Sequence, residues 1–407
     1  MTEAYIVATA RSPIGRAGKG SLTGVRADDM AAQMVEAAMG ELPGLDPERV
    51  DDLLLGCGMP GGEQGMNMAR NVAVMLGWDA VPGATITRYC SSSLQTTRMA
   101  FHAIKAGEGD VFVSAGVESV SRMDRGSSDH IPGENLANPV FNAARARTDE
   151  RSGAGTPVWE DPRLNGDLPD VYIAMGQTAE NVAGLCGVTR EEQDAYAARS
   201  QQRAERAIAA GFWERDITPL TLADGTVVAA DDGPRPGTTV EVLATLEPVF
   251  RPDGTVTAGN ACPLNDGAAA VVVVSDRVVE ELGLRPLARI VATGVSGLSP
   301  EIMGLGPVEA SRRALALAGL TIDDMDLVEI NEAYAAQVIP AARELGVDPE
   351  RLNVKGGSIA VGHPFGMTGA RITSTLINAL AEDGGRYGLE TMCVGGGQGM
   401  AMVLERL

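Results

Sequence analysis

The sequence predicts an α/β protein built from two similar halves with a large insertion between them. Strand-like and helix-like segments alternate near both ends of the chain. Two pairs of segments repeat: VDDLLLGCG (50–58) is similar to DDMDLVEINEA (323–333), and GDVFVSAG (109–116) to LETMCVGGG (389–397). Residues 121–246 differ, because they begin with a stretch rich in Gly, Pro, Asn and charge. With 407 residues, the chain is long enough for two or three domains.

The first half is predicted to span residues 1–120 and to be completed by about 247–284. Apolar runs predict its strands, at 5–10, 50–58, 84–90 and 111–119. Two helix-like segments lie between the strands, at 28–40 and 91–107. Each ends in a glycine, the usual residue beyond a helix C-terminus, and the second begins with serines suited to an N-cap.

The insertion, 121–246, contains helix-like segments at 178–187 and 190–211. Long loops on a rigid scaffold commonly carry function or oligomer contacts, so we expect the insertion to cover a binding site and to contact other copies. The second half is predicted at 285–407. Its elements are a helix at 307–320, a strand at 325–333, a strand at 353–364 that enters a glycine-rich turn, a helix at 367–380 and a final strand at 389–399.

Composition narrows the classes of function. A formal net charge of −21 argues against a face that binds nucleic acid or an anionic membrane. No apolar run reaches the roughly 18–20 residues that span a bilayer, and the N-terminus lacks a signal-peptide pattern. The five cysteines are scattered without CxxC spacing. We therefore expect a protein of the reducing cytoplasm, with neither a disulfide framework nor a metal site.

Four residues are candidates for chemistry because each lies where a predicted strand meets a turn. Cys90 precedes the first turn of a helix, whose backbone N–H groups are expected to stabilise a thiolate and lower the pKa of the thiol. His363 lies in GGSIAVGHPFG, Cys393 precedes three glycines, and Asn331 ends a fourth strand. Ligands of α/β proteins bind at the carboxyl ends of strands, so we expect one shared site.

The remaining cysteines and histidines have simpler interpretations. Cys57, Cys186 and Cys262, taken alone, are most simply small buried hydrophobic residues. His102 lies inside a predicted helix and is interpreted as structural, and His130 receives no role. The run GGGQG is by itself a weak signal, since it also suits a plain turn or a phosphate loop.

Longer motifs resemble one known family, the thiolases. The segments TRYCSSSLQ (87–95) and INEAYAAQ (330–337) are similar to its nucleophile and Asn-Glu-Ala motifs. GGSIAVGHPFGMTGAR (356–371) and CVGGGQGMAM (393–402) are similar to its two C-terminal signatures, and GTVTAGNACPLNDGAAAV (254–271) to its segment that contacts coenzyme A. The motifs follow in the family's order over essentially the whole chain. Within the family, the sequence most resembles actinobacterial thiolases that shorten bulky or long 3-oxoacyl-CoAs.

The resemblance implies a fold of two Rossmann-like halves in a five-layer α/β/α/β/α arrangement with an inserted loop domain. It also implies CoA-dependent cleavage of 3-oxoacyl-CoA, or the reverse condensation, in a ping-pong reaction through an acylated Cys90. His363 would activate Cys90 and the incoming CoA, and Cys393 would be the general acid or base. Backbone N–H groups of Cys90 and Gly395 would form one oxyanion site, and His363 with a water held by Asn331 would form the other.

The same resemblance implies that CoA is a co-substrate, that no cofactor is permanently bound, and that neither nucleic acid nor membrane is a partner. The chain is expected to form a homodimer or a homotetramer. The residues implied to contact CoA are Met175, Phe250, Ala258, Cys262, Met303, Ala333 and Tyr334.

The sequence departs from the family pattern at four positions, one of which, Tyr334 in place of the common phenylalanine, is conservative. Ser93 replaces a usual glycine behind the nucleophile, and Cys262 replaces a common serine near the pantetheine. Ala174 replaces a histidine of the short-chain branch, which should leave more room for the acyl group. Three other classes remain as alternatives. They are a β-ketoacyl synthase, which usually has two catalytic histidines, a papain-like hydrolase, whose order is Cys, His, Asn, and a non-catalytic lipid carrier with the same fold.

Overall fold

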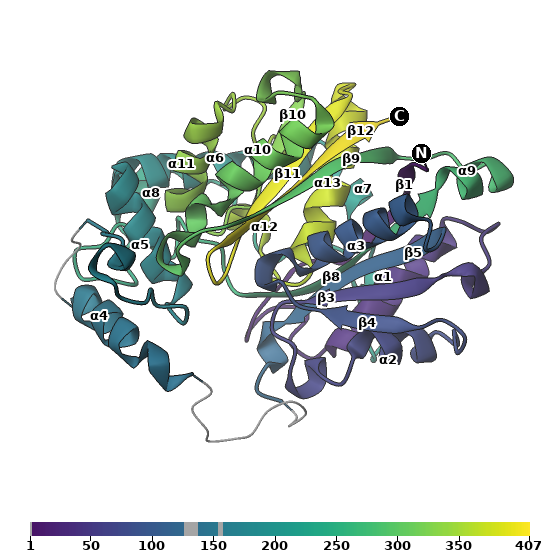
Figure 1. The fold of residues 1–407 in the computed structure, drawn as a ribbon, viewed down its shortest axis with the longest axis horizontal. Helices are drawn as coiled ribbons and strands as arrows, with labels where there is room; N and C mark the ends of the chain where they lie inside the picture. The colour runs from purple at the N-terminus through teal and green to yellow at the C-terminus, as the bar shows by residue number, and fades with distance from the viewer. Residues whose placement is uncertain (1, 126–136, 154–157) are drawn as a thin grey trace.

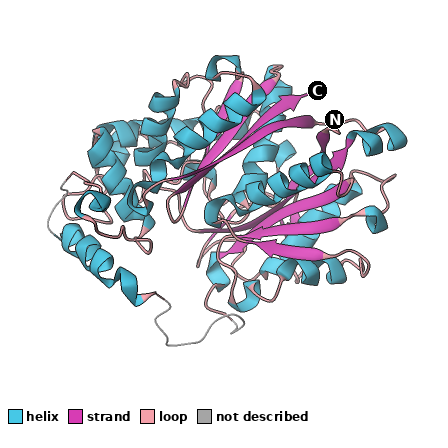
Figure 2. Ribbon diagram, viewed as in Figure 1, coloured by secondary structure: helices cyan, strands magenta, loops and turns pink. Residues whose placement is uncertain are grey.

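In a computed structural model, the structure describes residues 2–125, 137–153 and 158–407. Within them, ten strands form one sheet (Figures 1 and 2). The strands of the first half are β1 (Ala4–Arg11), β2 (Gly15–Arg16), β3 (Asp52–Cys57), β4 (Gly83–Ile86), β5 (Val111–Ser119) and β8 (Asn265–Ser275). Those of the second half are β9 (Ala288–Gly297), β10 (Leu327–Ile330), β11 (Tyr387–Val394) and β12 (Gln398–Arg406).

The helices fall into three groups along the chain. The first half contains α1 (Ala27–Gly40), α2 (Met68–Met75), α3 (Ser92–Ala106) and α9 (Asp276–Leu282). The second contains α10 (Gly306–Ala318), α11 (Ala335–Leu345), α12 (Ser358–Val361) and α13 (Thr368–Asp383). The insertion contains α4 (Asn142–Gly153), α5 (Met175–Cys186), α6 (Arg190–Ala209), α7 (Phe212–Asp216), α8 (Val240–Ala244) and a short hairpin of β6 (Leu220–Thr221) and β7 (Val227–Val228).

The predicted internal repeat is confirmed by the strand order. The first half runs β1-β8-β5-β3-β4 and the second β9-β12-β11-β10, with the edge strands β1 and β9 paired to each other. In both halves the second and third strands are antiparallel, and the third and fourth are parallel. The repeated sequence segments form β3 and β10, and β5 and β11. The two halves therefore bring corresponding strand ends to one place.

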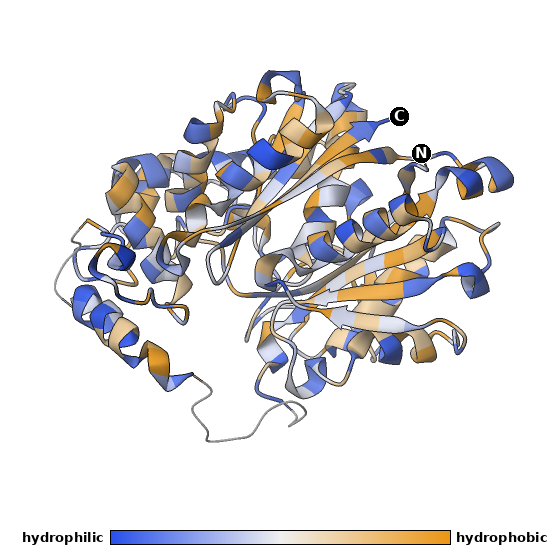
Figure 3. Ribbon diagram, in the orientation of Figure 1, coloured by the Kyte–Doolittle hydropathy of each residue, from blue (hydrophilic) through white to orange (hydrophobic). Residues whose placement is uncertain are grey.

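Packing produces five layers, as the α/β/α/β/α expectation requires. Helices α1 and α2 cover the outer face of the first half, and α10 and α11 cover that of the second. Helices α3 and α13 contact each other between the two sets of strands (Figure 1). The apolar run of β8 is explained by burial on both faces: Val271 and Val273 face the central core, and Val272 and Val274 the outer one. Figure 3 shows this apolar band along the strands.

Three predictions of local structure are wrong. No strand forms over 353–364; Leu352 makes a single bridge to Val328, and the chain then turns through Gly356 at φ 83° into α12. The strand predicted at 84–90 ends at Ile86. The run after Gly395 is a turn into β12, which the prediction did not separate from β11.

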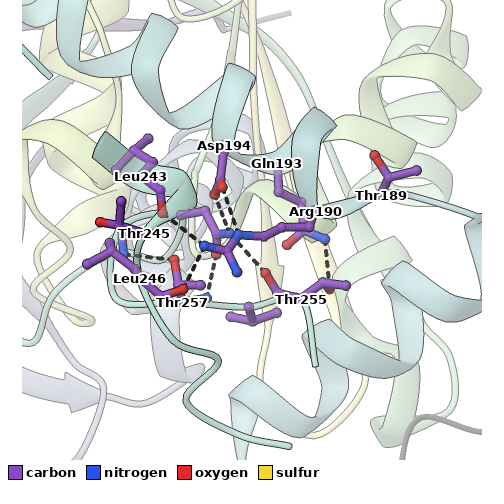
Figure 4. Close-up of polar contacts among 12 residues, drawn as sticks. Thr189, Arg190, Gln193, Asp194, Leu243, Thr245, Leu246, Thr255 and Thr257 are labelled. Carbon is purple, nitrogen blue, oxygen red and sulfur yellow. Dashed lines mark hydrogen bonds and ion pairs between the residues drawn. The ribbon is translucent and has the colours of Figure 1, made fainter. Parts of the chain in front are cut away.

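The insertion packs against the second half through α6. Arg190, near the start of α6, pairs with Asp194 at 2.7 Å and donates to the carbonyls of Leu243 and Leu246 at 2.9 and 2.7 Å (Figure 4). Asp194 also accepts from Asn260 at 3.0 Å. Helix α6 thus holds the segment that runs on to Cys262. In the part of the chain that the structure describes, no helix is both long and apolar enough to cross a membrane.

Candidate active site

Cys90 lies in a strained turn between β4 and α3. It is the middle residue of a 3-10 turn, Tyr89–Ser91, and Tyr89 adopts a left-handed φ of 44°. The hydroxyl of Ser92 accepts from the N–H of Arg88 at 2.9 Å and donates to the carbonyl of Tyr89 at 2.6 Å. Ser92 therefore braces the turn from inside, whereas the expected serine N-cap is absent, since Ser91 makes no side-chain cap of α3.

The pKa of Cys90 is raised to about 12, mainly by burial. A hydrogen bond from the N–H of Gly395 works in the opposite direction, and so does the N–H of Cys90 itself. The prediction that the helix N-terminus lowers this pKa is therefore wrong, because the thiolate loses more hydration than these donors replace. A nucleophilic thiolate at neutral pH needs a base beside it.

His363 is held as a neutral imidazole. It is 1% exposed, and burial, followed by the charge of Arg371, lowers its pKa to about 3. Its Nδ1 lies 2.7 Å from Oγ1 of Thr368, and that hydroxyl donates to the carbonyl of Pro364 at 2.7 Å. Because the hydroxyl proton is used there, Nδ1–H must donate to Thr368, which leaves a lone pair on Nε2.

Asn331 lies directly against that lone pair. Its Nδ2 is 3.2 Å from Nε2 of His363, and its Oδ1 accepts from the hydroxyl of Ser358 at 2.6 Å. Asn331 follows β10, as predicted, and its N–H bonds to Thr391 of β11. His363 does not follow a strand but comes after α12, so the predicted meeting of the two side chains is right while the element before His363 is wrong.

Cys393 occupies the last part of β11 and is fully buried. Its pKa is raised well above the usual value by burial and then by the neighbouring charges of Cys90 and Cys262. These three sulfurs are therefore close enough to influence one another, although they lie far apart in the sequence. A buried thiol of high pKa keeps its proton at neutral pH, as a general acid requires.

The residues expected to contact CoA lie around this thiol. Cys393, Met303 and Ala333 form one buried apolar cluster, with Met175 and Tyr334 against it. The ring of Phe250 lies 6.2 Å from that of Tyr334 and packs on Gly176, where a side chain would meet it at 2.2 Å. Cys262 joins this group through its N–H to the carbonyl of Ala333 at 3.0 Å. Ala258, by contrast, is exposed.

Glu118 lies near the site but was not singled out in the sequence. Glu118 is buried at the end of β5 and accepts N–H groups of Gly58, Met59 and Gly366 at 2.7, 3.2 and 2.8 Å. A glutamate closing an apolar strand was the available signal. Ser93, noted as a departure, accepts from the N–H of Ala370 at 2.9 Å and so joins α3 to α13.

His102 is exposed on α3, and His130 lies outside the described residues. Over the described ranges, no group of three or more His, Cys, Asp or Glu side chains is arranged to hold a metal ion.

Comparison with known proteins agrees with this geometry over the whole chain. Residues 4–277 match the family model of the thiolase N-terminal domain, and 284–406 that of the thiolase C-terminal domain. The chain is 42% identical to a 3-ketoacyl-CoA thiolase of Bacillus subtilis, with all of both chains covered. It is 44% identical to a β-ketoadipyl-CoA thiolase of Pseudomonas aeruginosa, covering all of this chain and 99% of the other.

A solved structure shows the same fold. The dimeric peroxisomal thiolase of Saccharomyces cerevisiae superimposes with a TM-score of 0.87 at 33% identity, covering all of this chain and 97% of that one. Two family models that together span nearly every residue, and relatives above 40% identity over full length, leave one assignment. The chain belongs to the thiolase family.

Proposed function

We propose that the chain cleaves 3-oxoacyl-CoA in a ping-pong reaction through an acyl group on Cys90. Thiolases are acyltransferases that use CoA for thiolytic cleavage or for the reverse condensation. The observation that carries the residue assignment is the Gly395 N–H on the sulfur of Cys90, beside a buried acid, Cys393. His363, a buried neutral imidazole that contacts Asn331, is the base of this proposal.

In the first step the sulfur of Cys90 attacks the 3-oxo carbonyl. His363 takes the thiol proton on Nε2, the unprotonated ring nitrogen, which the N–H of Asn331 faces at 3.2 Å. The N–H groups of Cys90 and Gly395 receive the oxyanion that forms on that carbonyl. The pKa of about 12 at Cys90 makes this base necessary.

In the second step the bond between C2 and C3 breaks and the enolate of acetyl-CoA leaves. Cys393 protonates the enolate carbon, while His363 and a water held by Asn331 stabilise the enolate oxygen. His363 returns the proton it took from Cys90 to the Cys393 thiolate and is neutral again. It then takes the proton of the thiol of a new CoA, whose sulfur attacks the acyl group, and this proton passes to Cys90 as its sulfur leaves. In the synthetic direction Cys393 removes the α-proton of acetyl-CoA instead.

Isotope-labelled acetyl-CoA tests this assignment. Brief incubation should add one acetyl group to the peptide that contains Cys90, and Cys90→Ala should abolish both the label and thiolysis of acetoacetyl-CoA. A label on another peptide, with none at Cys90, would refute the assignment. Unlabelled wild-type protein that still cleaves acetoacetyl-CoA would exclude the covalent route.

The acyl group is proposed to be longer or bulkier than acetoacetyl, as in degradative β-oxidation. Ala174 is exposed and directly precedes Met175, which packs beside Cys393. A histidine there would reduce the space for the acyl chain, and each additional buried methylene contributes about 0.8 kcal/mol. The relatives include β-ketoadipyl-CoA thiolases, so a dicarboxylic acyl group is the second candidate.

A chain-length series decides between these substrates. The kcat/KM values for C4, C8, polycyclic and β-ketoadipyl substrates should favour the long or bulky acyl groups, and Ala174→His should shift the ratio toward C4. Preference for C4 in the wild type, or an unchanged ratio in the variant, would refute the pocket argument. The thiolase assignment does not depend on this result.

The chain is proposed to form a homodimer or homotetramer in the cytoplasm. Strand β4 ends the sheet on one side, and near it Met66 is 73% and Tyr89 47% exposed, as suits pairing with a second copy. The cysteines are all free thiols, which a reducing compartment preserves. Light scattering that gives the mass of one chain at micromolar concentration would refute the assembly.

A further inference from the structure

A line of buried polar groups runs from a guanidinium to the active-site histidine. Nη2 of Arg371 donates to Oγ of Ser358 at 2.7 Å, and Ser358 donates to Oδ1 of Asn331 at 2.6 Å. Nδ2 of Asn331 is 3.2 Å from Nε2 of His363. All four side chains are at most 2% exposed, so water does not offer them alternative partners.

The direction of each hydrogen bond in this line is fixed. A guanidinium has only donors, so Ser358 must accept from Arg371. The one hydroxyl proton of Ser358 is then free to point at Asn331, whose oxygen accepts it. The amide of Asn331 is thereby held with its N–H groups toward His363.

This orientation matters because Nε2 of His363 changes from a hydrogen-bond acceptor to a donor during the proposed reaction. While Nε2 carries a lone pair, an amide N–H suits it. Once Nε2 has taken the proton of Cys90, it becomes a donor, and a freely rotating amide would turn its oxygen to that N–H. Such a rotation would occupy the imidazolium proton and remove the donor of Asn331, so neither would reach the enolate oxygen.

We propose that Ser358 and Arg371 are positioning residues that keep the N–H groups of Asn331 toward the reacting atoms throughout the cycle. The inference rests on the function proposed above and adds two residues that touch no substrate. Nη2, which donates to Ser358, is the guanidinium nitrogen of Arg371 that makes a hydrogen bond, since Nε and Nη1 have no partner within the described residues. Its charge faces Glu329, a buried carboxyl whose pKa is raised to about 8 by burial.

A double-mutant cycle on turnover tests the proposal. Ser358→Ala should lower kcat for acetoacetyl-CoA thiolysis by about tenfold, the effect of losing one buried hydrogen bond, and leave KM within about twofold. In an Asn331→Ala background the same change should have no further effect, since the residue it positions is gone. An equal loss of kcat in both backgrounds would show an effect independent of Asn331 and overturn the proposal.

The reactivity of Cys90 gives a readout of opposite sign that needs no turnover. In Ser358→Ala the amide oxygen becomes free to accept from imidazolium, which stabilises the pair of thiolate and imidazolium. The pH profile of Cys90 alkylation by iodoacetamide should therefore move to lower pH while kcat falls. A general structural defect would instead lower kcat and also slow the alkylation of Cys90. A pH profile of alkylation that does not move would overturn the proposal.

Two further variants complete the test. Asn331→Asp places an oxygen toward Nε2 permanently and should reproduce both changes, which covers the case in which Ser358→Ala does not fold. Ser374→Ala, a matched control on α13, removes a buried hydroxyl that contacts Thr9 and Asp216 and should change neither readout. Wild-type protein without thiolysis of any 3-oxoacyl-CoA would sink the proposed function, whereas the alkylation profiles would still judge the positioning.

Discussion

The two halves of the molecule share a strand order but contribute different chemistry. The first half provides Cys90 on a turn that is strained at Tyr89. The second half provides His363, Asn331 and Cys393, and its Gly395 donates to the sulfur of Cys90. The repeated scaffold thus carries the proposed nucleophile on one half and the groups proposed to move protons on the other.

Each half has a buried glutamate near a strand end that joins it to another part of the molecule, and the partners differ. Glu118 joins the halves, because it accepts from Gly58 of the first and Gly366 of the second. Glu332, after β10, joins the second half to the insertion; it accepts from Tyr196, Ser200, Asn353 and the N–H of Ile359 at 2.8, 2.7, 2.8 and 3.1 Å. The first carboxylate thus ties the two halves together near the start of α3, and the second ties the insertion to the turn that leads to His363.

The largest expected effect separates the two kinds of chemistry. Cys393→Ala should lower thiolysis of acetoacetyl-CoA by about 10³-fold, because the enolate loses its acid. Acetylation of Cys90 by acetyl-CoA, followed by mass spectrometry, should stay within about tenfold. Cys186→Ala, which changes a half-buried thiol at the end of α5, should behave as wild type. Equal loss of both half-reactions in Cys393→Ala would contradict the proposed assignment of different roles to the two halves.

A second test compares the pH dependence of stability. The pKa of His363 is about 3 in the folded chain and about 6.5 when unfolded, so the unfolded state takes up its proton first. The contribution of the neutral His363 to the free energy of unfolding is therefore fully present above about pH 6.5. It is lost as the pH falls toward 3, by about 2 kcal/mol between pH 7 and pH 5. Urea unfolding of His363→Asn should show a pH dependence weaker by that amount.

The exposed His102 supplies the control for this test. Burial and then the charge of Arg98 also lower the pKa of His102, so His102→Asn should weaken the loss between pH 7 and pH 5, but by less than His363→Asn. Cys90, with a pKa of about 12, titrates outside this range and should contribute nothing to the difference. If His363→Asn and wild type unfold with the same pH dependence, the buried neutral imidazole is wrong.

The smallest expected effect concerns the contact between the halves. Ser93→Ala removes the acceptor of the Ala370 N–H, which should lower the free energy of unfolding by about 1 kcal/mol. Because Cys90 and its turn keep their other contacts, kcat should remain within about twofold of wild type. A much larger loss of kcat would mean that the packing of α3 on α13 sets the position of Cys90.

The sequence was sufficient for the layers, because strand periodicity and the motifs depend on neighbours in the chain. It predicted that Cys90, Asn331, His363 and Cys393 would share a site, and the structure brings Asn331 to His363, and Cys393 to Cys90. It missed the pKa of Cys90, since burial depends on residues from the other half. It also missed α12, whose turn is determined by contacts with Glu332.

The position of β8 in the sheet also determines when the first half can complete its folding during translation. This strand lies between β1 and β5, yet it follows the whole insertion in the chain. Pairing across such a separation is slow, because a long loop must close first. Until Ser275 has emerged, β1 and β5 lack the strand between them and expose backbone groups that other chains can bind. The sulfur of Cys90 thus becomes competent late, and a nascent chain stopped before β8 is expected to aggregate rather than to act as an enzyme.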